Sequence, residues 1–136
     1  MILIDSNVLM YAAGTPHRNK AACAALIERI AAGRVDAVLD AEVLQEILHR
    51  YRAIGRWSSG RELYDLARQI IPGVIPITVE ILDVARSLLD AHSALMARDA
   101  LHAAVCREAG LDAICTYDRD FDRIPGIRRL EPSQVP

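Results

Sequence analysis

The sequence predicts one α/β domain over residues 1–136, built on a mainly parallel sheet of four to five strands with helices on both faces. Two observations support this class. Short β-branched and apolar runs alternate along the chain with longer segments of helical periodicity, which is the pattern of strand–helix–strand units. The chain is also 52% hydrophobic and, at 136 residues, long enough to bury a single core, with no visible linker or internal repeat.

The N-terminal part predicts a strand, a loop and a helix. Residues 2–4 are a short apolar run that ends at Asp5, as expected of a buried strand. We expect a polar loop to follow this strand. Thr15 and Pro16 are typical of an N-cap and a first helical position, so a helix is predicted to start there and to run to about Ala32.

The central part predicts two further strands and two helices. Residues 35–39 form a predicted strand, and Asp40 can cap a helix whose apolar residues recur at three- and four-residue spacing as far as Tyr51. After a turn around Gly55 to Gly60, a helix is predicted over residues 61–71. A Pro-Gly pair ends it, and a strand is predicted over residues 74–77.

The C-terminal part continues the alternation. Thr78 is expected to begin a helix that runs to about Ala91. A helix over residues 99–109 and a strand over 113–116 follow, and residues 127–130 add an edge strand.

Composition and charge exclude several classes of protein and indicate the cell compartment. With 16 basic and 18 acidic residues, the formal charge of −2 excludes proteins that coat nucleic acid or membrane by bulk charge. No uncharged stretch approaches the roughly 20 apolar residues of a membrane span, and no signal peptide is visible. The three cysteines lack paired spacing, so we expect reduced thiols in a cytoplasmic protein.

Four acidic residues are expected at the carboxyl edge of the sheet. In an open parallel sheet, the loops that follow the strands line the binding crevice. Asp5 ends the first strand, Asp118 follows a later one, Asp99 starts a helix, and Glu46 lies in the second turn of another. Each acid alone has a structural explanation, such as a helix cap for Asp99 or an ion pair of Glu46 with Arg50. Their joint placement is what predicts a site.

Electrostatics indicates what such a site binds. Two like charges about 4 Å apart repel by roughly 4 kcal/mol at an effective dielectric constant near 20. Three or four converging carboxylates therefore either take up protons or bind a cation. Oxygen ligands without a set of Cys or His favour Mg²⁺ or Mn²⁺ over Zn²⁺, and a hydrated Mg²⁺ suits phosphate chemistry.

Four motifs resemble those of PIN-domain ribonucleases, and their order and the chain length resemble the VapC-like toxins of bacterial toxin–antitoxin pairs. The motifs are Ile-Asp-Ser-Asn (4–7), Leu-Gln-Glu-Ile-Leu (44–48), Ala-Arg-Asp-Ala-Leu-His-Ala-Ala (97–104) and Thr-Tyr-Asp-Arg-Asp-Phe (116–121). The resemblance extends from Ile2 to about Pro132. It implies a three-layer sandwich and an endoribonuclease in which a metal-activated water attacks an RNA phosphodiester and leaves 5′-phosphate and 3′-hydroxyl ends.

The resemblance also implies residue roles. Asn7 and Thr116 correspond to polar residues that orient ligands or water. Glu42 competes with the glutamate one turn later, and Asp120 or Asp122 could take the place of the last acid. The implied catalytic and Mg²⁺- or Mn²⁺-binding acids are Asp5, Glu46, Asp99 and Asp118.

The implied partners are an RNA substrate, a cognate antitoxin protein and a second copy of the chain, with no membrane. One alternative is a non-catalytic PIN-like module that binds RNA or protein, although such a module would ordinarily have lost one of the acids. Another is a phosphatase of the aspartyl-phosphate type. That class expects a second Asp where Asn7 stands and a lysine near the last acidic loop, whereas the only lysine is Lys20.

Two further features allow a functional or a structural interpretation. The candidate RNA contacts are Arg50, Arg52, Arg56 and Trp57, a basic stretch with an aromatic that could steer a phosphate backbone and stack a base. Its structural alternative is a solvated helix and turn. His102 shares a helix face with Asp99, so a metal or general-base role is open, but a packed histidine that makes local hydrogen bonds is the favoured interpretation.

Overall fold

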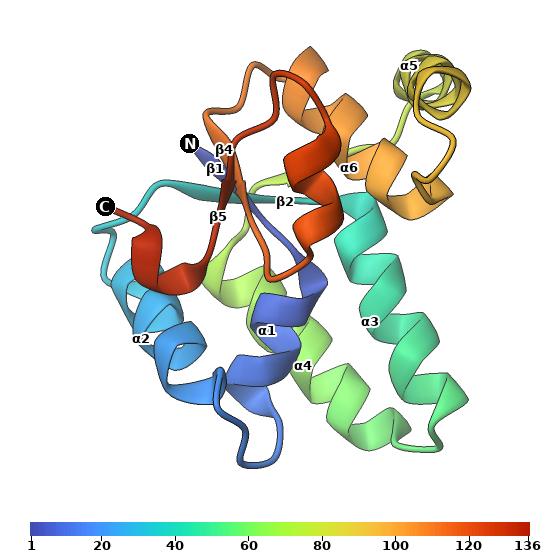
Figure 1. Cartoon of the computed structure of the whole chain (residues 1–136). Helices are drawn as coiled ribbons and strands as arrows, with labels where there is room; N and C mark the ends of the chain where they lie inside the picture. Colours follow the sequence, from blue (N-terminus) through green and yellow to red (C-terminus); the bar gives the residue numbers. More distant parts are fainter.

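Five short parallel strands form the centre of the fold, in the order β3-β2-β1-β4-β5 (Figure 1). The computed structural model describes all residues, Met1–Pro136. In the register, Ile2 of β1 pairs with Ala37 of β2 on one side and with Ala113 of β4 on the other. The predicted parallel sheet is therefore confirmed. The strands are β1 (Ile2–Ile4), β2 (Ala37–Asp40), β3 (Val74–Ile75), β4 (Ala113–Cys115) and β5 (Arg129–Leu130).

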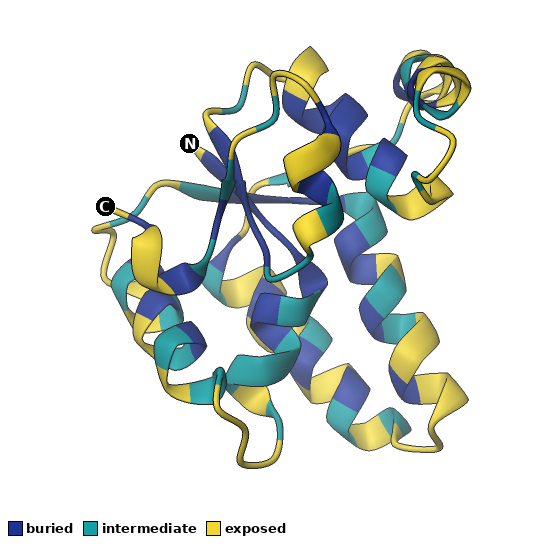
Figure 2. Cartoon of the chain, in the orientation of Figure 1, coloured by how far each residue is buried: buried dark blue, intermediate teal, exposed yellow.

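Helices cover both faces of the sheet, because successive strand residues point to opposite sides. Ile2 and Ile4 pack into one core with buried residues of the first four helices, whereas Leu3 packs into a second core with α5 and α6. Figure 2 shows the strands buried between these layers. The helices are α1 (Ser6–Ala13), α2 (Lys20–Ala31), α3 (Ala41–Ala53), α4 (Trp57–Ile70), α5 (Val79–Ala91) and α6 (Ala97–Glu108), with 3₁₀ turns η1 (Arg119–Arg123) and η2 (Pro132–Gln134).

The segment after β1 differs from the prediction, because helix α1 stands where a polar loop was expected. The Asp5 side chain caps this helix by accepting a hydrogen bond from the Ser6 backbone amide at 2.7 Å. Val8 and Leu9 anchor it in the core. The prediction that a helix begins at Thr15 and Pro16 was wrong. These residues belong to the connection, and α2 begins only at Lys20.

The α3–α4 pair also differs from the prediction, since α4 begins at Trp57 and not near residue 61. Gly60, which suggested a turn, lies inside α4 where it packs on α3. A Cβ atom added to Gly60 would lie 2.4 Å from the Cβ of Tyr51. The glycine therefore permits close packing of two helices and does not end one. The predicted caps at Asp40 and Thr78 are confirmed.

The chain order places a crevice at the carboxyl ends of β1 and β4. After β1 the chain builds β2 and β3 on one side of the sheet, and it then crosses to build β4 and β5 on the other. Because the order of the strands reverses at β1, the loops that follow β1 and β4 diverge and leave a crevice between them. Ligands bind at such points in open parallel sheets. None of the helices combines the length and hydropathy that a membrane span requires.

Candidate active site

Asp5 stands at the centre of the crevice, at the junction of β1 and α1. Its side chain is 8% exposed. One carboxylate oxygen accepts from the Ser6 amide, and the other accepts from the Thr116 hydroxyl at 2.7 Å and from the Asn7 amide at 3.2 Å. Burial raises the pKa of Asp5, and the charge of His102 and the hydrogen bond from Thr116 offset this only in part. The fold thus holds a buried carboxylate that a nearby cation would stabilise.

Asn7 and Thr116 fasten Asp5 to the loop after β4. The Asn7 side-chain nitrogen donates to Thr116 Oγ1 at 2.9 Å, and the same oxygen accepts from the Asp118 backbone amide at 3.0 Å. Asn7 Oδ1 is buried and has no hydrogen-bond partner. An oxygen of this kind is available to a ligand or an ordered water.

Three further acids, Asp99, Asp118 and Asp120, meet on the other side of the crevice. Asp99 lies in the first turn of α6, and Asp118 caps η1 by accepting from the Asp120 amide at 2.9 Å. One carboxylate oxygen of each lies within 4.8 Å of the others. Burial raises the pKa of Asp99 to about 6, and the charge of Asp118 adds to this effect. None of the three acids forms an ion pair, so their carboxylates repel one another.

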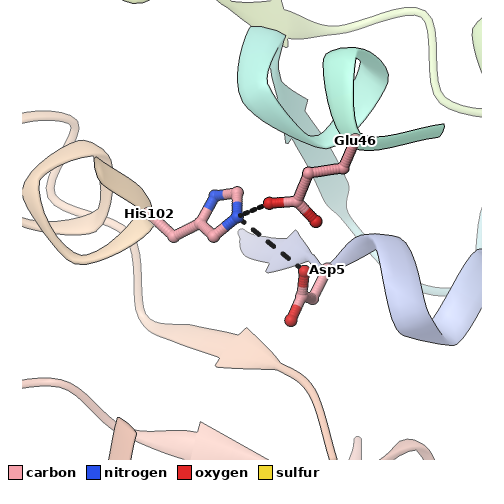
Figure 3. Close-up of side chains that lie close together, drawn as sticks. All are labelled: Asp5, Glu46 and His102. Atoms are coloured by element: carbon pink, nitrogen blue, oxygen red, sulfur yellow. Dashed lines mark hydrogen bonds and ion pairs between the residues drawn. The ribbon is translucent and has the colours of Figure 1, made fainter. Parts of the chain in front are cut away.

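Glu46 approaches Asp5 from helix α3, and a buried histidine of α6 holds it there (Figure 3). His102 Nε2 lies 3.0 Å from Glu46 Oε1 and 3.9 Å from Asp5 Oδ1. Its Nδ1 lies 2.7 Å from Asp40 Oδ2, and the Ser6 hydroxyl donates to Glu46 Oε2. Because both ring nitrogens face carboxylates, the imidazole fixes the position of Glu46.

The pKa values of this group follow from the same contacts. Burial alone would lower the pKa of His102, but the hydrogen bonds and charges of Asp40 and Glu46 raise it well above its ordinary value. For Glu46, burial alone would raise the pKa, but the hydrogen bond and charge of His102, with the hydrogen bond from the Ser6 hydroxyl, lower it overall. The carboxylates around His102 are therefore paired with a buried cation, whereas Asp99, Asp118 and Asp120 form no ion pair.

The crevice is a cavity of about 400 Å³. The predicted acids Asp5, Glu46, Asp99 and Asp118 all line it, and the structure brings Asp120 into it as well. Asp122 does not join them, because it turns outward and accepts from Arg129 Nε at 2.9 Å. Glu42, the competitor of Glu46, does not line the cavity.

The candidate RNA contacts separate into two groups. Arg50 and Arg56 line a second cavity that meets the first at Asn7. Arg52 instead packs over Trp57, with its guanidinium carbon 4.7 Å from the ring centroid, and neither residue lines that cavity.

Sequence reasoning missed Asp40 and Ser6 as members of the site and did not assign His102 to it. The packed interpretation of His102 is correct in that the ring is 1% exposed, yet its partners are the site carboxylates. Its spacing of three residues from Asp99 was the available signal. Asp40 was assigned only as a helix cap, a role it has through Val43, while its second oxygen binds the histidine.

The donor set suits a hard divalent cation. Five carboxylates line one cavity, and Asp99, the half-buried acid with the raised pKa, faces two others. The unpartnered Asn7 Oδ1 lies beside them. Both His102 nitrogens are engaged by carboxylates, which leaves oxygen as the available ligand atom, and oxygen ligands are those that Mg²⁺ and Mn²⁺ prefer. The cluster could therefore bind a divalent metal ion.

Comparison with known proteins agrees with this geometry. The family model described as "PIN domain" matches residues 2–127. The chain is 42% identical over 130 residues to a VapC ribonuclease of Mycobacterium bovis and equally to ribonuclease VapC13 of Mycobacterium tuberculosis, covering 96% of this chain and 99% of each relative.

Solved structures share the fold at low sequence identity. FitAcB from Neisseria gonorrhoeae is 18% identical with a TM-score of 0.74, covering 97% of this chain and 98% of that one. VapBC2 from Rickettsia felis, bound to a DNA fragment from its promoter, is 16% identical with a TM-score of 0.76, covering 96% and 98%. The resemblance carried by the four sequence motifs is thereby confirmed. The chain belongs to the PIN-domain family, among the VapC ribonucleases.

Proposed function

We propose that this single domain, residues 1–136, is a metal-dependent endoribonuclease that hydrolyses RNA phosphodiester bonds and acts as the toxin of a toxin–antitoxin pair. The observation that carries the proposal is the convergence of five carboxylates, from four separate segments of the chain, in one cavity at the switch point of the sheet. The names of the relatives at 42% identity, VapC ribonucleases, support the same activity.

Each residue of the cavity has a proposed role. Asn7 and Thr116 hold Asp5 and orient a ligand or water beside it. His102 positions Glu46. The carboxylates of the cavity would hold Mg²⁺ or Mn²⁺, which when bound would supply a water of lowered pKa and would stabilise charge on the phosphoryl oxygens. The proposed ligands of the ion are Asp5, Glu46, Asp99 and Asp118, with Asp120 as the adjacent acid.

The test compares RNA cleavage by the wild type with cleavage by Asp99→Asn, in Mg²⁺, in Mn²⁺ and in EDTA. Asp122→Asn is the control, since it removes a carboxylate of the neighbouring turn η1 that lies outside the cavity. We expect Asp99→Asn to lose activity while Asp122→Asn keeps it, with products that carry 5′-phosphates. Equal cleavage by folded Asp99→Asn would refute the active-site assignment, and 2′,3′-cyclic phosphates would indicate attack by the ribose hydroxyl instead.

The non-catalytic alternative is weaker but has a clear signature. A PIN-like module that only binds RNA or protein would show metal-independent binding and no cleavage by any variant. The complete set of cavity acids favours the enzyme, because converging carboxylates repel one another and need a functional reason to persist.

The proposed partners are a cognate antitoxin and a second copy of the chain. One solved relative is a VapBC pair bound to promoter DNA, which supports an antitoxin partner for this chain as well. Co-expression with the product of the neighbouring reading frame should give a complex that co-purifies and does not cleave RNA. Light scattering of the isolated chain measures its own oligomeric state, for which we expect twice the monomer mass.

A further inference from the structure

A groove between α1 and α3 continues the acidic cavity and differs from it in charge. We call it the basic groove; it has a volume of about 320 Å³, and its lining includes Asn7, Tyr11, His17, Arg50, Tyr51 and Arg56. We propose that the basic groove binds the single-stranded RNA next to the scissile bond, with phosphates on Arg50 and Arg56 and a nucleobase on the rings of Tyr11 and His17. This inference rests on the proposed ribonuclease activity and names the strand-binding part of the same site.

The position of the basic groove makes it an extension of the active site. Asn7, which binds Asp5 and Thr116, lines both cavities. Helix α1 packs against α3, and the two run down from the crevice in Figure 1. Arg50 follows Glu46 by four residues, so it lies one turn further along the same face of α3. A strand that leaves the acids along this face meets the basic groove first.

Charge favours a phosphate backbone in the basic groove. Its lining contains two guanidinium groups and an imidazole but no carboxylate, whereas the acidic cavity contains five carboxylates and one arginine. A polyanion that must place one phosphate among acids needs cations for its neighbouring phosphates. Arg50 and Arg56 are both exposed and make no ion pair, so their guanidinium groups are free to contact phosphate oxygens.

The aromatic pair provides a stacking surface. The rings of Tyr11 and His17 stack with centroids 4.4 Å apart and an interplanar angle of 25°. Tyr117 supports Tyr11 edge-on at 5.6 Å, and His17 Nδ1 accepts from the Asn19 amide at 3.1 Å, which fixes the imidazole. His17 is exposed at the outer end of the stack. Aromatic rings beside a basic groove are the usual means of holding unpaired bases without regard to sequence.

Arg52 provides the matched control. It lies on the same helix as Arg50 and is also exposed, but its guanidinium covers Trp57 and it does not line the basic groove. Replacing Arg52 removes the same charge from the same helix without removing a proposed contact. The inference therefore separates Arg50 and Arg56 from the other two residues of the basic stretch.

The first test measures binding of a fluorescein-labelled ten-nucleotide single-stranded RNA by anisotropy in EDTA, where cleavage does not interfere. We expect the double variant Arg50→Ala/Arg56→Ala to bind about tenfold or more weakly at low salt. We also expect a shallower plot of the logarithm of the binding constant against the logarithm of the salt concentration. The magnitude of its slope should fall by about 1.4, since each phosphate contact on a single strand contributes roughly 0.7. Arg52→Ala should keep the wild-type slope. If the loss of binding free energy per removed charge is the same in both variants, the effect is one of bulk charge and the groove is overturned.

The second test addresses the stack. His17→Ala should weaken binding of the same RNA by about fivefold or more, and it should have no effect on a probe of abasic ribose phosphates of equal length. An equal loss with both probes would show that His17 does not stack on a base and would overturn that contact.

Cleavage assays separate this inference from the proposed function. If the ribonuclease proposal holds, Arg50→Ala/Arg56→Ala should raise KM while kcat keeps its value, because the lost contacts hold the strand and not the reacting phosphate. If the wild type cleaves RNA with Mg²⁺ and the groove variants share its KM, the inference fails and the activity stands. If the wild type does not cleave RNA at all, the proposed function fails, and the anisotropy data still decide whether the groove binds a strand.

Discussion

His102 Nδ1 lies 2.7 Å from Asp40 Oδ2, and both side chains are buried, at 1% and 0% exposed. The contact joins helix α6 to the carboxyl end of β2, across 62 residues of sequence. On its other side the same ring holds Glu46. A buried ion pair of this kind therefore connects the stability of the fold to the arrangement of the active site.

We expect His102→Ala to destabilise the protein by about 3 kcal/mol, because it leaves the Asp40 carboxylate buried without its partner. It should also weaken Mn²⁺ binding, since Glu46 loses the group that positions it. Urea unfolding and calorimetric titration with Mn²⁺ measure the two effects. His49→Ala, which removes an exposed histidine of α3, should change neither; a His102→Ala protein as stable as the wild type would contradict the pairing.

The same contact predicts a pH dependence of stability. Burial opposes the charged ring, but Asp40 and Glu46 raise the pKa of His102 well above its ordinary value of 6.5, so the folded protein holds this proton more tightly than the unfolded chain. The resulting stabilisation is complete below pH 6.5 and is lost as the pH rises through the folded-state pKa. Unfolding free energies measured from pH 6 to 10 should fall for the wild type more steeply than for His102→Ala. Parallel curves would contradict this assignment.

For Asp99 we expect that the ionised carboxylate lowers the stability of the fold, whereas the His102 ion pair raises it. Burial and the nearby Asp118 raise its pKa from 3.8 to about 6, so the folded state disfavours the ionised carboxylate. Stability is therefore lost as the pH rises from about 4 to about 6. We expect Asp99→Asn to stabilise the metal-free protein by about 1–2 kcal/mol at pH 8, after allowance for solvent screening of a half-buried group, and not at all below pH 4. Chemical denaturation at the two pH values tests this directly.

Metal binding should follow the same titration. Because the pKa of Asp99 is about 6, its proton competes with a divalent cation below that pH. We expect Mn²⁺ affinity to fall about tenfold per pH unit below pH 6 and to level off above pH 7. Titration of Asp99→Asn is the control, since its weaker binding should lack this pH dependence; a wild-type affinity constant from pH 5 to 7 would be inconsistent with the raised pKa.

We expect Gly60→Ala to lower the stability of the protein without acting directly on catalysis. A Cβ atom at this position would lie 2.4 Å from Tyr51 Cβ, so Gly60→Ala forces α4 away from α3. We expect a cost of about 1–3 kcal/mol, as for other overpacked cores. The exposed neighbour Ser58→Ala should have no such effect. Thermal unfolding of the two variants gives the comparison, and a Gly60→Ala protein that melts with the wild type would show that the helices can separate at little cost.

The sequence was sufficient to predict the parallel sheet and the placement of the four principal acids at its edge, because both follow from the order of strands and helices along the chain. Asp5 and Asp118 end neighbouring strands, and parallel strands bring such ends to one edge. Helix α1 was missed because its first residues, Ser6 and Asn7, are polar and favour a loop by composition. The cap by Asp5 and the contacts of Val8 and Leu9 with the core stabilise this segment as a helix.

The pairing of His102 with Asp40 could not be predicted, because the two residues meet only when α6 packs beside α3 at the end of β2. Similarly, the three acids 118, 120 and 122 are equivalent in the sequence. The turn η1 decides between them, because it directs Asp122 toward Arg129 and leaves Asp118 and Asp120 on the cavity.

The crossing of the chain from β3 to β4 has a consequence for synthesis. The residues that complete the cavity, from Asp99 to Asp120, are translated after Asp5 and Glu46. A nascent chain that has emerged only as far as Met96 holds only Asp5 and Glu46 of the acid set and has no strand β4 to hold them in place. For an enzyme proposed to cut RNA, the site is therefore assembled only after residues 99–120 have left the ribosome.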